Sequence, residues 1–197
     1  MTNAKVLKLL SRYRAYKEVQ EWAEAHGGPM EELWRDCERG DWMLWLAVRA
    51  KIGRRVVVNA ACACARTALQ YVPAGEERPR RAIETAEAWA RGDENLEAVR
   101  AAATAAKRFG VSSASASAAF AAYAAAAAAY AFAASAASGA YAAATAAVYA
   151  ADAAALAAAN DDMEIARARV LAECAELVRA YISAADIETV ALKGRTS

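Results

Sequence analysis

The sequence predicts an all-α fold, a compact multi-helix bundle of about seven to nine helices with closely packed Ala/Tyr-rich helices in its C-terminal half. Alanine, which has the highest helix propensity, dominates that half, and helix start and stop signals recur along the chain. Only 9 Gly and 3 Pro occur among 197 residues. The run "RRVVVN" resembles a strand, but it is short and continues into a helical pattern, so no strand is predicted.

The composition indicates a single helical domain over residues 1–197. Hydrophobic residues make up 58% of the chain and charged residues 24%, which is a globular rather than a disordered composition. We expect this domain to have two halves: residues 1–92 are charged and rich in Trp and Arg, and residues 93–192 are rich in Ala. The tail, residues 193–197, is expected to fray.

Capping and stop signals predict five helices in the N-terminal half. Asn3 can cap a first helix that ends at "HGGP", Pro29 suits the first turn of a second, and Asp41 can cap a third. Gly53 and the turn "PAGEER" bound a fourth helix, and Pro79 opens a fifth. The expected ranges are 3–25, 29–39, 42–52, 54–72 and 79–91.

The remaining helices lie in the C-terminal half. Asp93 can cap a helix that extends to about Arg108, and a last amphipathic helix begins at about Asp161. Between them, the alanine-rich region is expected to form two antiparallel or kinked helices that break at Ser138–Gly139.

The alanine-rich region has no charged side chain from Ser115 to Ala150. A membrane span is disfavoured because alanine methyl groups gain little on transfer to lipid and Ser, Thr and Tyr recur. We therefore expect buried helices, whose small side chains allow close approach and whose tyrosines fill the gaps. The larger residues also form a seam that could pack against a second copy, so a homo-oligomer is expected. This seam consists of Tyr123, Tyr130, Tyr141 and Val148.

Several classes of function are disfavoured by the sequence. The 24 basic and 23 acidic residues give a net charge of +1, which argues against a nucleic-acid partner. No phosphate-binding glycine loop, nucleophile elbow or metalloprotease helix is present, so we expect no catalytic residue and no enzyme activity.

The four cysteines are expected to be small buried thiols. Cys62 and Cys64 are two residues apart and therefore point to different sides of a helix, which disfavours a shared metal ion. We expect neither a metal nor a cofactor. The start "MTNAKVLKLLSRYR" lacks the apolar core of a signal peptide, so the expected location is the cytoplasm.

One group of residues is a candidate surface for a protein partner or a ligand. Arg and Trp are enriched among residues that dominate binding energies, and both occur around "DWMLWLAVR" and in the two helices after it. In the alternative interpretation, Arg49 and Arg66 close internal ion pairs with Asp41 or Glu84, and the tryptophans belong to the core. The candidate residues are Asp41, Trp42, Trp45, Arg49, Asn59, Arg66, Arg78, Arg80, Arg81 and Glu84.

Nearly the whole chain resembles the immunity proteins of bacterial polymorphic-toxin systems, relatives of which are also encoded by phages and prophages. The most specific segments are "ERGDWMLWLA" and "CARTALQYVPAGEERPRRAIETAEAWARG". The resemblance implies an all-α cytoplasmic protein that binds a partner, and it transfers no catalytic residue. The chain departs from such relatives in one respect: they often scatter Asp, Glu and Arg through the alanine-rich stretch, whereas residues 109–151 contain none.

Three hypotheses for function follow. The first is a non-enzymatic, antitoxin-like inhibitor that neutralises a toxin or another effector by stoichiometric binding. The second is a self-assembling structural protein that packs through its Ala/Tyr-rich helices. The third is a phage-encoded anti-defence protein that sequesters a small nucleotide with arginines and stacked tryptophans.

Overall fold

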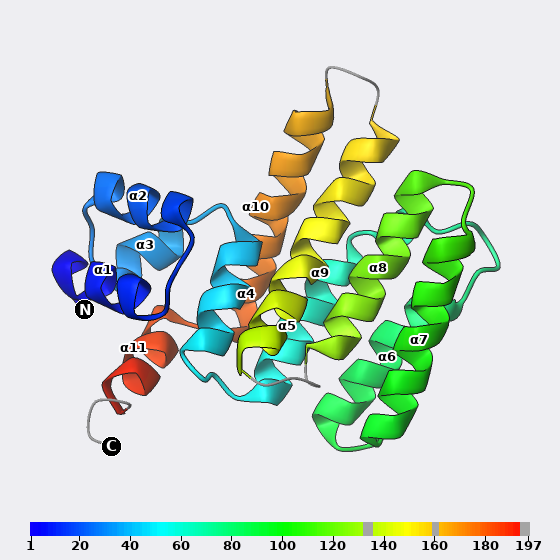
Figure 1. Cartoon of the computed structure of the whole chain (residues 1–197), viewed down its shortest axis with the longest axis horizontal. Helices are drawn as coiled ribbons and strands as arrows, with labels where there is room; N and C mark the ends of the chain where they lie inside the picture. The colour runs from blue at the N-terminus through cyan, green and yellow to red at the C-terminus, as the bar shows by residue number, and fades with distance from the viewer. Residues whose placement is uncertain (132–135, 159–161, 194–197) are drawn as a thin grey trace.

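The computed structural model describes residues 1–131, 136–158 and 162–193, and every regular element within these ranges is a helix (Figure 1). The predicted all-α class is therefore confirmed. The helices are α1 (Asn3–Arg12), α2 (Lys17–His26), α3 (Met30–Asp36), α4 (Gly40–Arg49), α5 (Arg54–Arg66), the short 3-10 helix η1 (Leu69–Tyr71), α6 (Arg78–Arg91), α7 (Leu96–Ser112), α8 (Ala116–Tyr130), α9 (Ala136–Ala157), α10 (Met163–Tyr181) and α11 (Ala184–Lys193).

The described ranges contain eleven α-helices, so the predicted number of seven to nine was too low. The first predicted helix is split into α1 and α2, because Arg14 adopts a left-handed backbone conformation with φ of 56°. The last predicted helix ends at Tyr181, and α11 follows it. A reciprocal cap starts α11: the amide of Ser183 donates to Asp186 Oδ2 (2.8 Å), and the amide of Asp186 donates to Ser183 Oγ (3.2 Å).

Several predicted boundaries were wrong. The caps predicted at Asn3, Asp41 and Asp93 are not the cap residues, because the N-cap positions of α1, α4 and α7 are held by Thr2, Arg39 and Asn95. α8 ends at Tyr130 and α9 begins at Ala136, so Ser138–Gly139 is not the break. These two residues lie in the first turn of α9, where amide groups have no partner within the helix and small or polar residues are tolerated. α5 ends at Arg66, and η1 replaces the predicted last turn up to Val72. Of the tail predicted to fray, residues 194–197 lie outside the described residues.

α8 lies at the centre of the alanine-rich half. From Ala121 to Ala129 every alanine of α8 is buried, on all sides of the helix, whereas Ala116 in the first turn is exposed. This is the pattern of a core helix rather than of a surface helix. Helices α5, α6, α7 and α9 surround it, and α9 runs antiparallel to it and also packs against α4 and α10 (Figure 1). The expected burial of the alanine-rich segment is thus confirmed for α8, and helices of the same chain cover it.

None of the described helices combines the length and the apolar character needed to cross a membrane.

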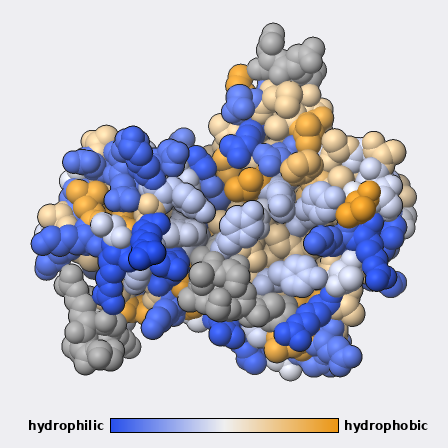
Figure 2. Space-filling view, viewed as in Figure 1, coloured by the Kyte–Doolittle hydropathy of each residue, from blue (hydrophilic) through white to orange (hydrophobic). Residues whose placement is uncertain are grey.

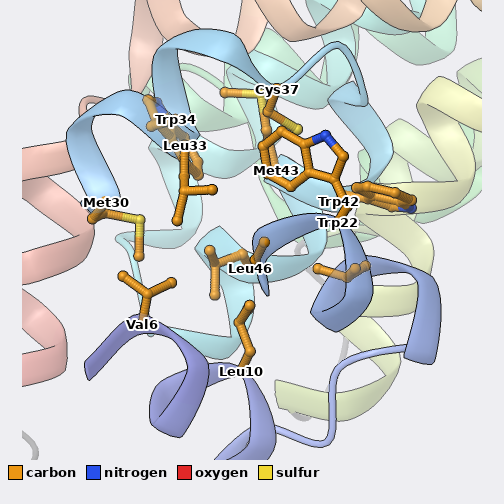
Figure 3. Close-up of a pocket in the computed structure, with 12 residues that line it drawn as sticks. Val6, Leu10, Trp22, Met30, Leu33, Trp34, Cys37, Trp42, Met43 and Leu46 are labelled. Atoms are coloured by element: carbon orange, nitrogen blue, oxygen red, sulfur yellow. The ribbon is translucent and has the colours of Figure 1, made fainter. Parts of the chain in front are cut away.

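Helices α1, α2, α3 and α11 form a group at one end of the molecule, beside α4 and α10 (Figure 1). We call this group the N-terminal lobe. Side chains of α1, α2, α3 and α4 point toward one another around a small apolar cavity of about 40 Å³, with Val6, Met30 and Leu46 among its lining (Figure 3). The core of the lobe is therefore continuous with that of α4.

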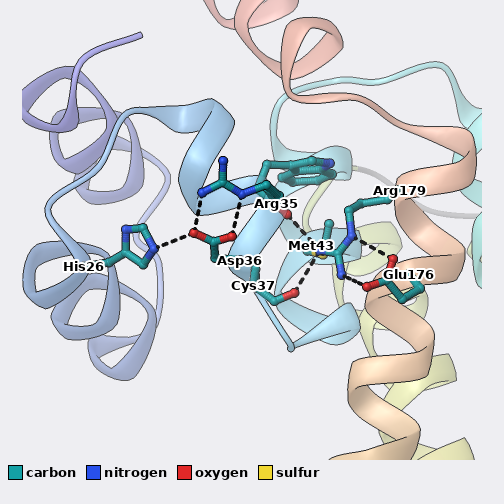
Figure 4. Close-up of polar contacts among 8 residues, drawn as sticks. His26, Arg35, Asp36, Cys37, Met43, Glu176 and Arg179 are labelled. Carbon is teal, nitrogen blue, oxygen red and sulfur yellow. Dashed lines mark hydrogen bonds and ion pairs between the residues drawn. The ribbon is translucent and has the colours of Figure 1, made fainter.

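Arg179 of α10 holds the C-terminal end of α3. Its Nη1 donates to the carbonyl oxygens of Trp34 (2.8 Å) and Cys37 (3.0 Å), and Glu176 accepts from Nη2 (2.8 Å) (Figure 4). Trp34 Nε1 in turn donates to the carbonyl of Ile182 (2.9 Å). A cation at a helix C-terminus satisfies carbonyls that have no partner within the helix, so this residue fastens the lobe to α10.

Gly40 allows α4 and α10 to approach closely. A Cβ atom on Gly40 would lie 2.5 Å from Cys174 Cβ and 2.7 Å from the Cys174 carbonyl carbon. A backbone atom cannot rotate away as a flexible side chain can, so any side chain here forces the two helices apart.

We expect Gly40→Ala to lower the free energy of unfolding by about 1–3 kcal/mol, because it overpacks this contact. Gly53→Ala is the matched control: the nearest atom to its Cβ would be Val56 Cγ2, at 4.0 Å. We expect the control to change stability by less than about 0.5 kcal/mol. Urea denaturation followed by circular dichroism measures both, and equal losses would contradict the close approach at Gly40.

Candidate partner-binding surfaces

The predicted Trp/Arg residues are distributed over several places rather than gathered in one. At the start of α4, Asp41 is 7% exposed and accepts from Arg39 Nε (2.9 Å) and Nη2 (2.7 Å). The guanidinium of Arg39 also lies 4.3 Å from the ring centroid of Trp42. Asp41 is thus paired with Arg39, a residue that the sequence analysis did not select, although it lies only two positions away.

Trp45 and Arg49 of α4 pack against the N-terminal lobe. Arg49 Nη2 donates to the carbonyl oxygen of Tyr13 (3.0 Å), and its guanidinium lies 5.9 Å from the Trp45 ring centroid. Trp45 is buried, and its ring centroid lies 6.1 Å from that of Tyr16. Both predicted residues therefore contribute to the contact between α4 and the lobe.

Arg66 joins α5 to α6. Its Nε and Nη2 donate to the two carboxylate oxygens of Glu87 at 2.9 and 2.7 Å, and this bidentate pair raises the pKa of Arg66. Arg66 thus forms an internal ion pair, with Glu87 rather than with the predicted Glu84. Glu84 is exposed, and Asn59 is half-buried on α5.

The remaining predicted arginines lie at the start of α6. Arg78 pairs with Glu76, and its guanidinium lies 5.1 Å from the ring centroid of Phe109. Arg80 pairs with Glu77 (3.5 Å), whereas Arg81 is exposed. Because α5 lies between α4 and α6 and contacts both, the tryptophans of α4 and these arginines belong to separate parts of the surface (Figure 1). Whether any of them binds a partner stays a prediction.

A cleft of about 360 Å³ separates the N-terminal lobe and the start of α4 from α10. Trp22 and Trp42 form its aromatic part, with ring centroids 6.1 Å apart in an edge-to-face arrangement. We call it the aromatic–acidic cleft. Its lining consists of Trp22, Asp36, Cys37, Glu38, Arg39, Trp42, Glu164, Arg167, Ala168 and Leu171.

The cations of this cleft are already engaged. Arg39 is bound to Asp41, and Arg167 Nε donates to Asp152 Oδ1 (2.9 Å). Asp36 accepts from Arg35 Nε (2.7 Å) and lies 3.1 Å from His26 Nε2 (Figure 4). The hydrogen bonds from Arg35, and then from His26, lower the pKa of Asp36 to about 2, so this carboxyl is ionised at neutral pH.

A second hollow, of about 380 Å³, lies over α7, α8 and α9. Figure 2 shows surface of intermediate hydropathy in the middle of the molecule, beside more hydrophobic surface, with hydrophilic residues farther out. We call it the tyrosine hollow. Its lining consists of Lys107, Val111, Tyr123, Ala126, Ala127, Tyr130, Tyr141, Ala142, Thr145 and Tyr149.

Three of the four predicted seam residues line the tyrosine hollow. Tyr130 Oη lies 3.1 Å from Thr104 Oγ1, and Tyr141 is 62% exposed. The ring of Tyr123 lies 5.9 Å from that of Tyr149, centroid to centroid. Val148, the fourth, is half-buried and is not part of this lining.

Tyr149 is a lining residue that the sequence analysis missed. It follows the lining residue Thr145 by four positions, a spacing that places both side chains on one face of α9. Partial burial, followed by the neighbouring Tyr141, Asp152 and Tyr123, raises the pKa of Tyr149. Its hydroxyl is therefore neutral at physiological pH and able to donate a hydrogen bond.

The cysteines are all free thiols and all buried. Burial raises the pKa of Cys37 to about 11, and the pKa values of Cys62 and Cys64 are raised as well. Within the described ranges no group of three or more His, Cys, Asp or Glu residues is arranged to hold a metal ion.

A family model described as "Imm-5 like putative immunity protein" matches residues 50–177. The chain belongs to this family. No curated protein and no solved structure matches the chain. The tyrosine hollow lies wholly within the segment that matches the Imm-5 like family, whereas helices α1 to α4 precede it.

Arg66 and Arg81 of this Imm-5 like protein allow a test of which predicted site residues stabilise the fold. Arg66→Glu places two carboxylates against each other, so we expect it to lower the free energy of unfolding by at least about 1 kcal/mol. Arg81→Glu, with the same charge change on an exposed side chain, should alter it by less than about 0.5 kcal/mol.

Chemical denaturation of the two variants at low and moderate salt measures this difference. An Arg66→Glu variant as stable as the parent would show that the ion pair with Glu87 does not stabilise the fold.

Proposed function

We propose that this protein neutralises a protein toxin by binding it in a stoichiometric, non-enzymatic complex, and that the tyrosine hollow is where the toxin docks. The observation that carries the proposal is the open tyrosine-lined hollow inside the family-matched segment. The family supports an immunity role, and the hollow supplies a surface suited to it.

Tyrosine is well suited to a docking surface. It is enriched among residues that dominate binding energies, because a large flat ring is buried at a small cost in side-chain entropy. Tyr141 is 62% exposed and Val111 is 72% exposed, so this face presents large side chains to solvent. A patch of this kind on a single chain is typical of an interaction site.

The hollow is also held rigidly. The alanines of its floor, Ala126 and Ala127, belong to α8, which its neighbours enclose. Tyr123 is fixed between the ring of Tyr149 and Gly110, where a Cβ atom would lie 2.6 Å from Tyr123 Cε1. A preformed surface of this kind loses little conformational freedom when a partner binds.

The lining supports a partner of particular chemistry. Among the described residues that line the hollow, Lys107 is the one with a charged side chain. We expect the toxin to insert an apolar or aromatic side chain among the tyrosine rings and to place a carboxylate beside Lys107.

The other predicted functions have less support. Nucleotide sequestration would need free arginines, whereas Arg66, Arg78 and Arg80 are each paired with a carboxylate. Self-association would use the same tyrosine face, so it is a direct competitor of toxin docking and the same experiment tests it.

We expect Tyr141→Glu to reduce protection against the toxin, because a carboxylate would replace an exposed ring in the hollow. The probe is the protein product of the adjacent reading frame, co-expressed with the chain in a bacterial host. Growth measures protection, and light scattering after size exclusion measures the complex, which should be 1:1 and at least about tenfold weaker in the variant.

Tyr181→Glu is the matched control, because Tyr181 is 46% exposed and lies at the end of α10, outside the hollow. It should protect as well as the parent. Failure of the parent chain to protect, or equal protection by both variants, would contradict the proposal. A dimer of the chain alone that Tyr141→Glu dissociates would assign this face to a second copy instead.

A further inference from the structure

We propose that the aromatic–acidic cleft is a second recognition site, which binds an arginine-containing basic segment of a protein partner. This proposal rests on the proposed function in one respect only. Because that function is to bind a toxin, the ligand is taken to be a segment of a protein and not a free small cation. Its geometry and charge are independent of the tyrosine hollow, because the two share no lining residue.

The cleft is open and large enough for a side chain. Its volume of about 360 Å³ lies between Trp22 and Trp42 on one side and the first turns of α10 on the other. Figure 3 shows the two tryptophans side by side at the edge of the lobe. Both rings are half-buried, so they are fixed in place and still present surface to the cleft.

Charge determines which partner fits. Glu38, between α3 and α4, and Glu164, at the start of α10, are both exposed, and neither has an ion pair within the described part of the chain. The lining cations Arg39 and Arg167 are each bound to their own carboxylate. The cleft therefore offers two uncompensated carboxylates to an incoming cation.

Arginine matches these walls better than lysine does. A guanidinium can stack on a tryptophan ring and donate two parallel hydrogen bonds to a carboxylate, whereas an ammonium is a point charge. The cleft already contains one such contact, because Arg39 lies 4.3 Å from the ring centroid of Trp42. An anionic ligand such as a nucleotide would meet repulsion from the same carboxylates.

The site lies largely outside the family-matched segment. Six of its ten lining residues precede residue 50. The N-terminal lobe, α4 and the loop between α3 and α4 thus supply most of a cleft that residues 50–177 alone could not form. A contact at this location would add selectivity between partners, whereas the immunity role itself is shared by the family.

The test uses fluorescein-labelled peptides of four Arg-Gly repeats, four Lys-Gly repeats and four Glu-Gly repeats, with the full-length chain at 150 mM NaCl. Fluorescence anisotropy should show binding of the arginine peptide, weaker binding of the lysine peptide and none of the glutamate peptide. We expect Glu38→Gln/Glu164→Gln to weaken arginine-peptide binding by about tenfold.

Glu94→Gln/Glu97→Gln is the matched control, because it removes two exposed carboxylates around the start of α7, away from the lining of the cleft. It should bind as the parent does, and melting curves should show that both double variants remain folded. Because the net charge of the protein is +1, polycations are not attracted to it in general. A loss of peptide binding in one double variant therefore reports on the site that was changed.

Three results would overturn the proposal: no binding of the arginine peptide, an equal loss in both double variants, or displacement by spermine at the same concentration as the peptide. The last result would assign the cleft to a small polyamine. No toxin is present in this assay and Tyr141→Glu should leave it unchanged, so its outcome is separate from that of the docking proposal.

Discussion

The close packing around α8 is the constraint on which the rest of the structure depends. Its alanines from Ala121 to Ala129 are buried on all sides, and four neighbouring helices pack around it. Each methyl group contributes only about 0.8 kcal/mol through burial, so the helix is held by many short contacts rather than by a few large side chains. A charged side chain among them would be desolvated without a partner, which explains why the buried stretch Ala118–Ala129 has none.

The tyrosine hollow follows from the same packing. Large side chains cannot be accommodated between helices that lie this close, so the tyrosines of α8 and α9 are confined to the face where the pair reaches the surface. Gly110 illustrates the constraint, because Tyr123 occupies the space that a side chain there would need. The tyrosine hollow and the alanine core are therefore two consequences of one pattern, in which small residues face inward and rings face outward.

Much of the fold could be predicted from the sequence, whereas the details that depend on tertiary contacts could not. Helix propensity and caps indicated the all-α class, and the missing charges indicated a buried α8. The break at Arg14 follows no Gly or Pro, and Arg49 binds the carbonyl of the preceding Tyr13. The partner of Arg66 depends on how α6 is rotated against α5, because Glu84 and Glu87 lie one turn apart on the same face of the helix.

The two proposed surfaces have opposite chemistry, and this difference bears on how the protein selects a partner. The hollow presents rings beside Lys107, whereas the cleft presents rings beside Glu38 and Glu164. A partner that fits the first surface with a carboxylate and the second with a guanidinium satisfies both. A partner with these charges exchanged meets like charges twice, and the free-energy penalties of two separate sites add. Specificity can then arise from mismatched partners being rejected, while the rings contribute most of the affinity.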